Sequence, residues 1–135
     1  MVSWKNPDEL SSFKELCSDT HRADLKTLMS GEHSAERVAD YKVAMSSGLS
    51  YCFASKAVDD EILSKLQALA DEAELSAKFR ELYNGAVINT GENRLVLHQL
   101  CRGQLGDPVI ADGVDKHEFY THEQTKIADF SDAVH

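Results

Sequence analysis

Apolar side chains recur at intervals of three and four residues along most of the chain, the spacing of one face of an α-helix. The pattern is clearest in two segments between Val58 and Gly85. Asp59 is a suitable N-cap for the first, and Glu61 and Lys65 are spaced for an ion pair across one turn. Gly85 ends the second, because glycine accepts the left-handed dihedrals that follow a helix. The apolar faces of the two predicted helices are Ile62, Leu63, Leu66, Leu69, Ala70 and Ala73, and Leu75, Phe79, Leu82 and Tyr83.

Two shorter helices are predicted near the N-terminus. Asn6 is a suitable N-cap for the first, because Pro7 fits the first position of a helix. Asp19 or Thr20 is expected to cap the second, which Gly31 ends. Their apolar stripes are Leu10, Phe13, Leu16 and Cys17, and Leu25, Leu28 and Met29.

The period of the pattern changes to two after a short helical turn at residues 35–40. Apolar and polar or small residues then alternate on both sides of Ser46-Ser47-Gly48, where Gly48 can take the left-handed position of a three-residue turn. Residues 41–54 are therefore predicted to form a β-hairpin. An isolated hairpin is only marginally stable in water, so this one requires a surface to pack on.

The stretch from Asn84 to Gly103 is predicted to hold a turn and a further helix. Residues 86–88 are too few for a helix and are expected to be extended. Thr90 is a plausible N-cap for an amphipathic helix that begins near Leu95. The apolar face of that helix would consist of Val96, Leu97, Leu100 and Cys101.

The C-terminal part of the chain is predicted to be a loop followed by one long helix. Gly106-Asp107-Pro108 and Asp112-Gly113 indicate turns, with a brief extended piece at Val109-Ile110. Residues 115–135 are in helical register, and the pattern continues to His135. The positions that carry this register are Phe119, Tyr120, Glu123, Ile127, Phe130 and Val134.

Composition and charge exclude several classes of protein. The 135 residues have the length of a single domain, and their net charge of −9 argues against binding to nucleic acid or to anionic membrane surfaces. No apolar run approaches the length of a membrane span, and the N-terminus lacks the features of a signal peptide. Three widely spaced cysteines are typical of reduced thiols. These features predict a cytoplasmic protein.

Residues 88–103, INTGENRLVLHQLCRG, resemble the I-N-x-T-E-N-R-x-V-L-H-x-x-L-R segment near the N-terminus of the glucose-6-phosphate isomerase family. The similarity continues at residues 51–72, 83–85 and 109–113, so it covers most of the chain from about Arg37 onward. Gly91 departs from the family pattern, in which Thr often directly precedes the Glu. The residues in matching order are Ile88, Asn89, Glu92, Asn93, Arg94, Val96, Leu97, His98 and Leu100.

The resemblance implies a fold and an activity. The residue pattern predicts that residues 1–135 are mainly α with one β-hairpin, and the resemblance implies that they form the N-terminal portion of an α/β sugar-isomerase fold. Members of the family interconvert glucose 6-phosphate and fructose 6-phosphate through ring opening and a cis-enediol, without metal or cofactor. They are several-fold longer, and their phosphate-binding and proton-transferring residues lie further along the chain.

The resemblance also implies what this chain lacks. It is expected to be a truncated scaffold with no catalytic, cofactor-binding or metal-binding residue. Its partner would be the remainder of the isomerase chain; full-length members are homodimers, and only the complete enzyme binds sugar phosphate. Within the motif, His98, Arg94 and Glu92 are expected to tie their helix to a neighbouring domain, and the structural motif residues are Asn89, Glu92, Asn93, Arg94 and His98.

Two groups of residues resemble catalytic or metal sites. Cys101 and His98 are three residues apart, close enough to share a proton, but a cysteine on an apolar face is usually buried and inert. His117, Glu118, His122, Glu123 and His135 include metal-binding residue types. Because His117 and His122 are five residues apart, they diverge by about 140° on a helix, whereas zinc pairs require i, i+4 spacing.

Two further patterns favour structural roles. The glycines at 103 and 106 follow a predicted helix, whereas a phosphate-binding loop precedes one. The carboxylates of Asp59, Asp60 and Glu61 suit the start of a helix and give only weak support for an acid/base pair.

Three hypotheses about function remain, in descending order of support. The chain is part of a glucose-6-phosphate isomerase, a stand-alone helical interaction module, or a small thiol enzyme that uses Cys101.

Overall fold

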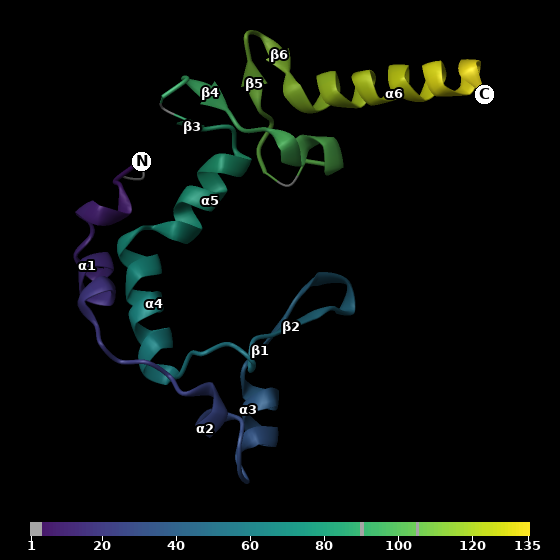
Figure 1. Cartoon of the computed structure of the whole chain (residues 1–135). Coiled ribbons are helices and arrows are strands. Elements are labelled where there is room, and N and C mark those ends of the chain that lie inside the picture. The colour runs from purple at the N-terminus through teal and green to yellow at the C-terminus, as the bar shows by residue number, and fades with distance from the viewer. Residues whose placement is uncertain (1–3, 90, 105) are drawn as a thin grey trace. The chain divides into compact units, whose positions relative to one another are not determined.

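The computed structural model of the chain describes residues 4–89, 91–104 and 106–135 (Figure 1). These residues form two compact units, one from Trp4 to Ala73 and the other from Glu74 to His135. Helices predominate in both, which confirms the mainly α prediction, and the strands form short antiparallel pairs. Among the helices that the structure describes, none is long and apolar enough to cross a membrane.

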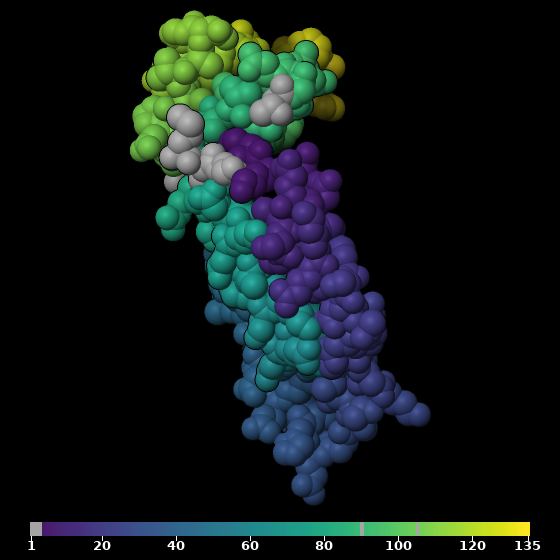
Figure 2. Space-filling view, turned by 90° about the vertical axis from the view of Figure 1, so that its left-hand side faces the viewer, coloured from purple at the N-terminus to yellow at the C-terminus, as the bar shows by residue number. Residues whose placement is uncertain are grey.

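The first unit consists of helices and one hairpin. In chain order its elements are the 3-10 helix η1 (Pro7–Glu9), α1 (Ser11–Ser18), α2 (Leu25–Leu28), α3 (Ser34–Asp40), β1 (Lys42–Ala44), the 3-10 turn η2 (Ser46–Gly48), β2 (Ser50–Cys52) and α4 (Asp60–Glu72). Helix α1 packs along α4, as Figures 1 and 2 show.

The predicted N-terminal helix is divided in two by Leu10. This residue has extended dihedrals (φ −82°, ψ 137°) and is buried, at 3% exposure. Asn6 begins η1 as predicted, with its backbone N–H bonded to the Glu9 carboxylate at 2.9 Å. Helix α1 has no side-chain cap at Leu10; the carboxylate of Glu72 instead accepts the N–H groups of Ser11 and Ser12 at 3.0 and 2.7 Å. Tertiary contact therefore replaces the local cap.

The predicted cap of the second helix is wrong. Asp24 caps α2 by accepting the N–H of Lys26 at 3.1 Å, and the helix is four residues long. Asp19 is instead the residue after α1, and its carboxylate binds Lys65 of α4. Tertiary ion pairing determines the role of this aspartate.

The predicted hairpin is confirmed. Strands β1 and β2 pair in antiparallel register, with Val43 opposite Tyr51, and Gly48 has φ +74° in the turn. Every residue of both strands is exposed. The prediction for α4 is also confirmed: Asp59 accepts the N–H of Ile62 at 3.0 Å, and Lys65 lies 2.6 Å from Glu61.

The second unit contains two more hairpins and a long helix. Its elements are α5 (Leu75–Tyr83), β3 (Val87–Asn89), β4 (Arg94–Leu95), the 3-10 helix η3 (His98–Arg102), β5 (Ile110–Ala111), β6 (Val114–Asp115) and α6 (Lys116–Val134). The helix stop at Gly85, the extended piece after it and the C-terminal helix are as predicted. The prediction of a single hairpin is corrected by the pairs β3–β4 and β5–β6.

The amphipathic helix predicted from Leu95 is wrong. Arg94 and Leu95 pair with β3, Asn93 has φ +52°, and only a five-residue 3-10 helix follows. The predicted cap, Thr90, lies outside the described residues. Pairing between strands competes with helix formation here, because the apolar side chains can reach the core from either backbone conformation.

The core of this unit lies between η3 and the loop that precedes β5. It consists of Leu97, Leu100 and Val109, with Leu95 and Tyr120 packed against it. Gly85 is required beside it, because a Cβ at this position, at φ +78°, would lie 2.5 Å from a methyl group of Val109.

Candidate functional site

The motif residues form a loop that is held by its own side chains. The Asn89 side chain accepts the N–H of Glu92 at 3.2 Å and donates to its carboxylate at 3.1 Å. Arg94 lies opposite Asn89 in the β3–β4 ladder, with Nη1 3.9 Å from the Glu92 carboxylate. Asn93 takes the left-handed conformation in the turn, where asparagine is tolerated. The structure thus brings four of the five motif residues into one turn.

The fifth motif residue, His98, begins η3 and its side chain is exposed. Glu92 and Arg94 are also largely exposed, at 62% and 76% of the side chain. An ion pair between side chains this open to water contributes little to stability. The geometry supports a role in shaping the loop, and the expected contact with a neighbouring domain stays a prediction.

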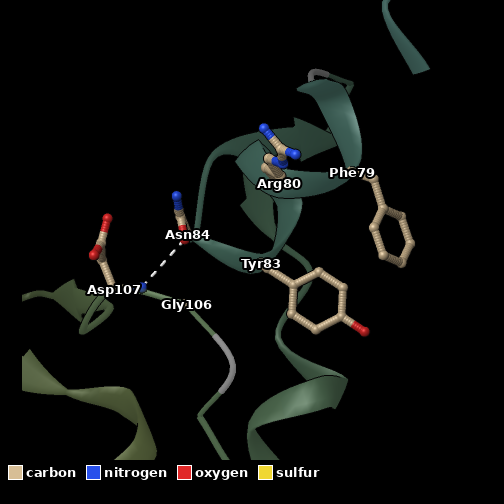
Figure 3. A pocket seen from close by; sticks show the side chains of 6 residues that line it. All are labelled: Phe79, Arg80, Tyr83, Asn84, Gly106 and Asp107. Carbon is tan, nitrogen blue, oxygen red and sulfur yellow. Dashed lines mark hydrogen bonds between the residues drawn. The ribbon is translucent and has the colours of Figure 1, made fainter. Parts of the chain in front are cut away.

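A cavity of about 490 Å³ lies between the end of α5 and the loop that precedes β5 (Figure 3). The Asn84 side chain crosses between the two segments and accepts the N–H of Asp107 at 3.2 Å. Gly106 permits this approach, because a Cβ there would lie 2.3 Å from the Asn84 oxygen. The lining residues are Phe79, Arg80, Tyr83, Asn84, Gly106 and Asp107.

The cavity is lined by both apolar and charged side chains. The rings of Phe79 and Tyr83 meet edge to face with centroids 4.9 Å apart. Arg80 adds a cation and Asp107 an anion. In Figure 3 the two rings point to one side, and Asn84 and Asp107 lie on the other. The side chains therefore do not converge on one reacting atom, as general acid/base catalysis requires.

Sequence reasoning did not find this cavity. Phe79 and Tyr83 were identified only as part of an apolar helix face, and the glycine at 106 only as a turn residue. The i, i+4 spacing of Phe79 and Tyr83 could have indicated an aromatic pair. The approach of residues 106–107 to the end of α5 could not be read from the chain.

A second polar cluster lies in the first unit, where the segment after α1 meets the start of α4. His21 Nε2 lies 2.6 Å from the Asp59 carboxylate, and Lys65 Nζ lies 2.5 Å from Asp19 and 2.6 Å from Glu61. The bond to Asp59 raises the pKa of His21, and the bond from Lys65 lowers the pKa of Asp19. Hydrogen bonding to Asp19 and Glu61 likewise raises the pKa of Lys65.

The direction of each pKa shift favours the charged forms of Lys65, Asp19 and Asp59, which stabilises the ion pairs. The Asp59 pKa is lowered first by the N–H of Ile62 that it caps and then by His21. The predicted capping role of Asp59 is therefore extended by a tertiary contact. The arrangement holds the segment after α1 and the start of α4 together.

The structure corrects the expected burial of Cys101. Its thiol is exposed in η3, because Leu97 and Leu100 supply the core contacts of this segment. His98 is exposed as well. The Cys101 carbonyl accepts a hydrogen bond from Gln124 of α6 at 2.9 Å.

The other candidate groups occupy ordinary positions. Among the described residues, no three His, Cys, Asp or Glu side chains are placed to hold a metal ion. His117 and His122 lie on α6, and Gly103 follows η3 with φ +118°.

Comparisons with known proteins give a consistent result. A family model described as phosphoglucose isomerase matches residues 52–135, which include the motif loop and the cavity. The glucose-6-phosphate isomerase of Treponema denticola is 47% identical over 139 residues, covering 99% of this chain and 26% of that protein. The isomerases of Treponema pallidum and Borreliella afzelii are 41% and 38% identical, covering 99% and 100% of this chain and 26% and 25% of their own length. The chain therefore spans about a quarter of the length of these curated relatives.

Proposed function

This chain belongs to the phosphoglucose isomerase family, and we propose that it is the N-terminal part of a cytoplasmic glucose-6-phosphate isomerase. The observation that carries the proposal is similarity along the whole chain: relatives with this name match 99–100% of it at 38–47% identity. The complete enzyme would interconvert glucose 6-phosphate and fructose 6-phosphate, act as a homodimer, and need no metal or cofactor.

The proposed reaction requires groups that move a proton between neighbouring carbons. After ring opening, a carboxylate base removes the proton from C2 to form a cis-enediol, and the proton is returned to C1. The described polar groups of this chain are engaged with one another, as in the Asn89–Glu92 turn, or lie apart, as around the cavity. We therefore assign this chain a scaffolding role, with the proton-transferring groups in the remaining three quarters of the enzyme.

The relatives that match the chain do not support a stand-alone interaction module, since those described above all carry the isomerase name. A thiol enzyme at Cys101 also gains no support from them.

The test is a chimera in which this chain replaces the aligned segment of the Treponema denticola isomerase. Formation of fructose 6-phosphate from glucose 6-phosphate is followed for the chimera, for the 135-residue chain alone, and for the relative without its aligned segment. We expect turnover by the chimera only. Turnover by the isolated chain would show that its own residues carry the chemistry, and an inactive but folded chimera would contradict the assigned scaffold role.

A further inference from the structure

Among the residues that the structure describes, the contacts that anchor helix α6 to its unit come from the beginning of the helix. Its first turns contact η3 and β6, Tyr120 packs on the core, and Gln124 donates to the Cys101 carbonyl at 2.9 Å. Beyond Gln124, the side-chain hydrogen bonds found for the described residues stay within the helix, such as that from Thr125 to the carbonyl of Thr121. Figure 1 shows the helix continuing well past the hairpin β5–β6 of the same unit.

Helix α6 carries an apolar stripe that runs from its anchored first turns into the part beyond Gln124. At 100° per residue, its four large apolar side chains fall within an arc of about 80°. Glu123, whose carboxylate binds Lys126, is the charged residue inside that arc between Phe119 and Ile127. The opposite side is polar or small, with Thr121, Thr125 and Ala128 among its residues. The stripe consists of Phe119, Ile127, Phe130 and Val134, which are exposed to 46%, 68%, 72% and 67%.

A stripe of this kind indicates a covered surface. Leaving large apolar side chains in water forgoes the free energy of their burial, and contiguous apolar patches mark interaction sites. Tyr120 continues the stripe at one edge and already packs on the core of the unit. The face that packs on the core at the start of the helix is therefore exposed further along, at Ile127, Phe130 and Val134.

We propose that this stripe of α6 docks onto the part of an isomerase chain that lies outside the segment matched here. The proposal rests on the proposed function and names the surface through which the scaffold holds the rest of the enzyme. The curated relatives supply the occupant, because each is about four times as long as the part that matches this chain.

Two other occupants fit the observations less well. A second copy of the chain, or an anionic membrane, would have to approach a molecule with a net charge of −9. The stripe itself offers on the order of 400 Å² if its side chains are buried. That is about half of the 800 Å² per partner that a standard stable interface requires.

Hydrogen–deuterium exchange tests the proposal. The 135-residue chain and the Treponema denticola chimera are compared, and amide exchange is read over residues 125–134. We expect exchange at least about tenfold slower in the chimera than in the isolated chain, because docking suppresses fraying of the helix. The readout does not depend on catalysis. An inactive chimera with a protected helix would therefore contradict the proposed function and still support the docking surface.

Two pairs of substitutions test whether the slower amide exchange depends on the stripe. Ile127→Ser/Phe130→Ser removes two members of the stripe, and Thr125→Ser/Ala128→Ser places two serines on the opposite side without changing the charge. We expect the first pair to remove most of the protection in the chimera and the second to preserve it. Circular dichroism confirms that each variant is folded.

Three results would overturn the proposal. They are equal exchange in the chimera and the isolated chain, protection of the isolated chain that rises with its concentration, and equal effects of the two variant pairs. The second would identify a further copy of the chain as the occupant.

Discussion

Arg37 is a charged side chain that the fold buries, at 7% exposure. Its guanidinium donates to three backbone carbonyls between the hairpin and α4, those of Ala54 at 3.0 Å, Lys56 at 3.1 Å and Val58 at 2.7 Å. It also lies 3.9 Å from the centre of the Tyr41 ring. Only arginine has a planar fork that can reach several acceptors in this way.

Replacing Arg37 by Met is therefore expected to destabilise the unit from Trp4 to Ala73. The carbonyls of Ala54 and Val58 would lose their side-chain donor at a buried and a half-buried position, and we expect a loss of about 2–4 kcal/mol in the free energy of unfolding. Urea denaturation followed by circular dichroism measures it. Arg22→Met is the matched control, because Arg22 also donates to carbonyls but in an exposed position. Water can take the place of the Arg22 side chain, so we expect a smaller loss in the control. Equal losses of unfolding free energy in the two variants would contradict the role given to Arg37.

At the scale of elements, one carboxylate of α4 caps the start of α1. Glu72, in the last turn of α4, accepts both the N–H and the hydroxyl of Ser11 and of Ser12. These bonds, led by those from Ser12, lower the pKa of Glu72 to about 2. Glu72 thus supplies the cap that the sequence of α1 lacks.

The lowered pKa predicts how stability depends on pH. A carboxyl group whose pKa is lower in the folded state contributes stability that is complete above its unfolded pKa, near 4.5, and is lost as the pH falls toward 2. Glu72→Gln should lower the unfolding midpoint at pH 6 and flatten its decline between pH 4.5 and pH 2. Thermal unfolding across this range measures the effect.

Glu32→Gln serves as the control for the pH experiment. Glu32 is exposed and lies in the same unit. The control should keep the full decline below pH 4.5. An unchanged decline in Glu72→Gln would show that other carboxylates carry the acid sensitivity.

For the whole molecule, exposed apolar surface outweighs the core. Seventeen large hydrophobic side chains among the described residues are exposed, whereas five hydrophobic residues are buried. The exposed ones include a residue from each strand of the β1–β2 hairpin, Val43 at 54% and Tyr51 at 51%. A folded chain that keeps so much apolar surface in water is typical of one part of a larger structure.

This imbalance predicts that the isolated chain binds a hydrophobic dye. We expect anilinonaphthalene sulfonate to become strongly fluorescent with the folded 135-residue chain, and much less so per molecule with the isomerase chimera, in which the apolar faces are covered. Fluorescence titration at equal protein concentrations measures the difference. A weak signal from the chain that rises only when urea unfolds it would contradict the prediction.

Much of the fold followed from local sequence. The stop at Gly85, the N-cap at Asp59 and the turn at Gly48 are as predicted, because backbone dihedrals and capping bonds involve residues only a few positions apart. The position of the motif loop could also be predicted from the sequence. Its residues resemble the isomerase family, and the family model matches the part of the chain that contains them.

Other features depended on contacts between distant residues. The predicted helix at Leu95 is replaced by a strand and a 3-10 helix because Arg94 and Leu95 pair with β3. The same change exposes Cys101, whose burial had been inferred from that helix. The β5–β6 hairpin was missed, although Asp112-Gly113, with φ of +54° and +74°, is a typical two-residue hairpin turn.

By itself, the sequence determined the mainly helical character of this chain, its principal turns and the family to which it belongs. Those properties depend on side-chain periodicity, capping and residue identity, all of which are local. Only the tertiary structure decided that Glu72 caps α1, that Arg37 is buried, and that Asn84 joins residues 106–107 to form a cavity. These features arise from groups between 17 and 61 positions apart, whose meeting depends on the packing free energy of the whole unit and not on the preference of any one segment.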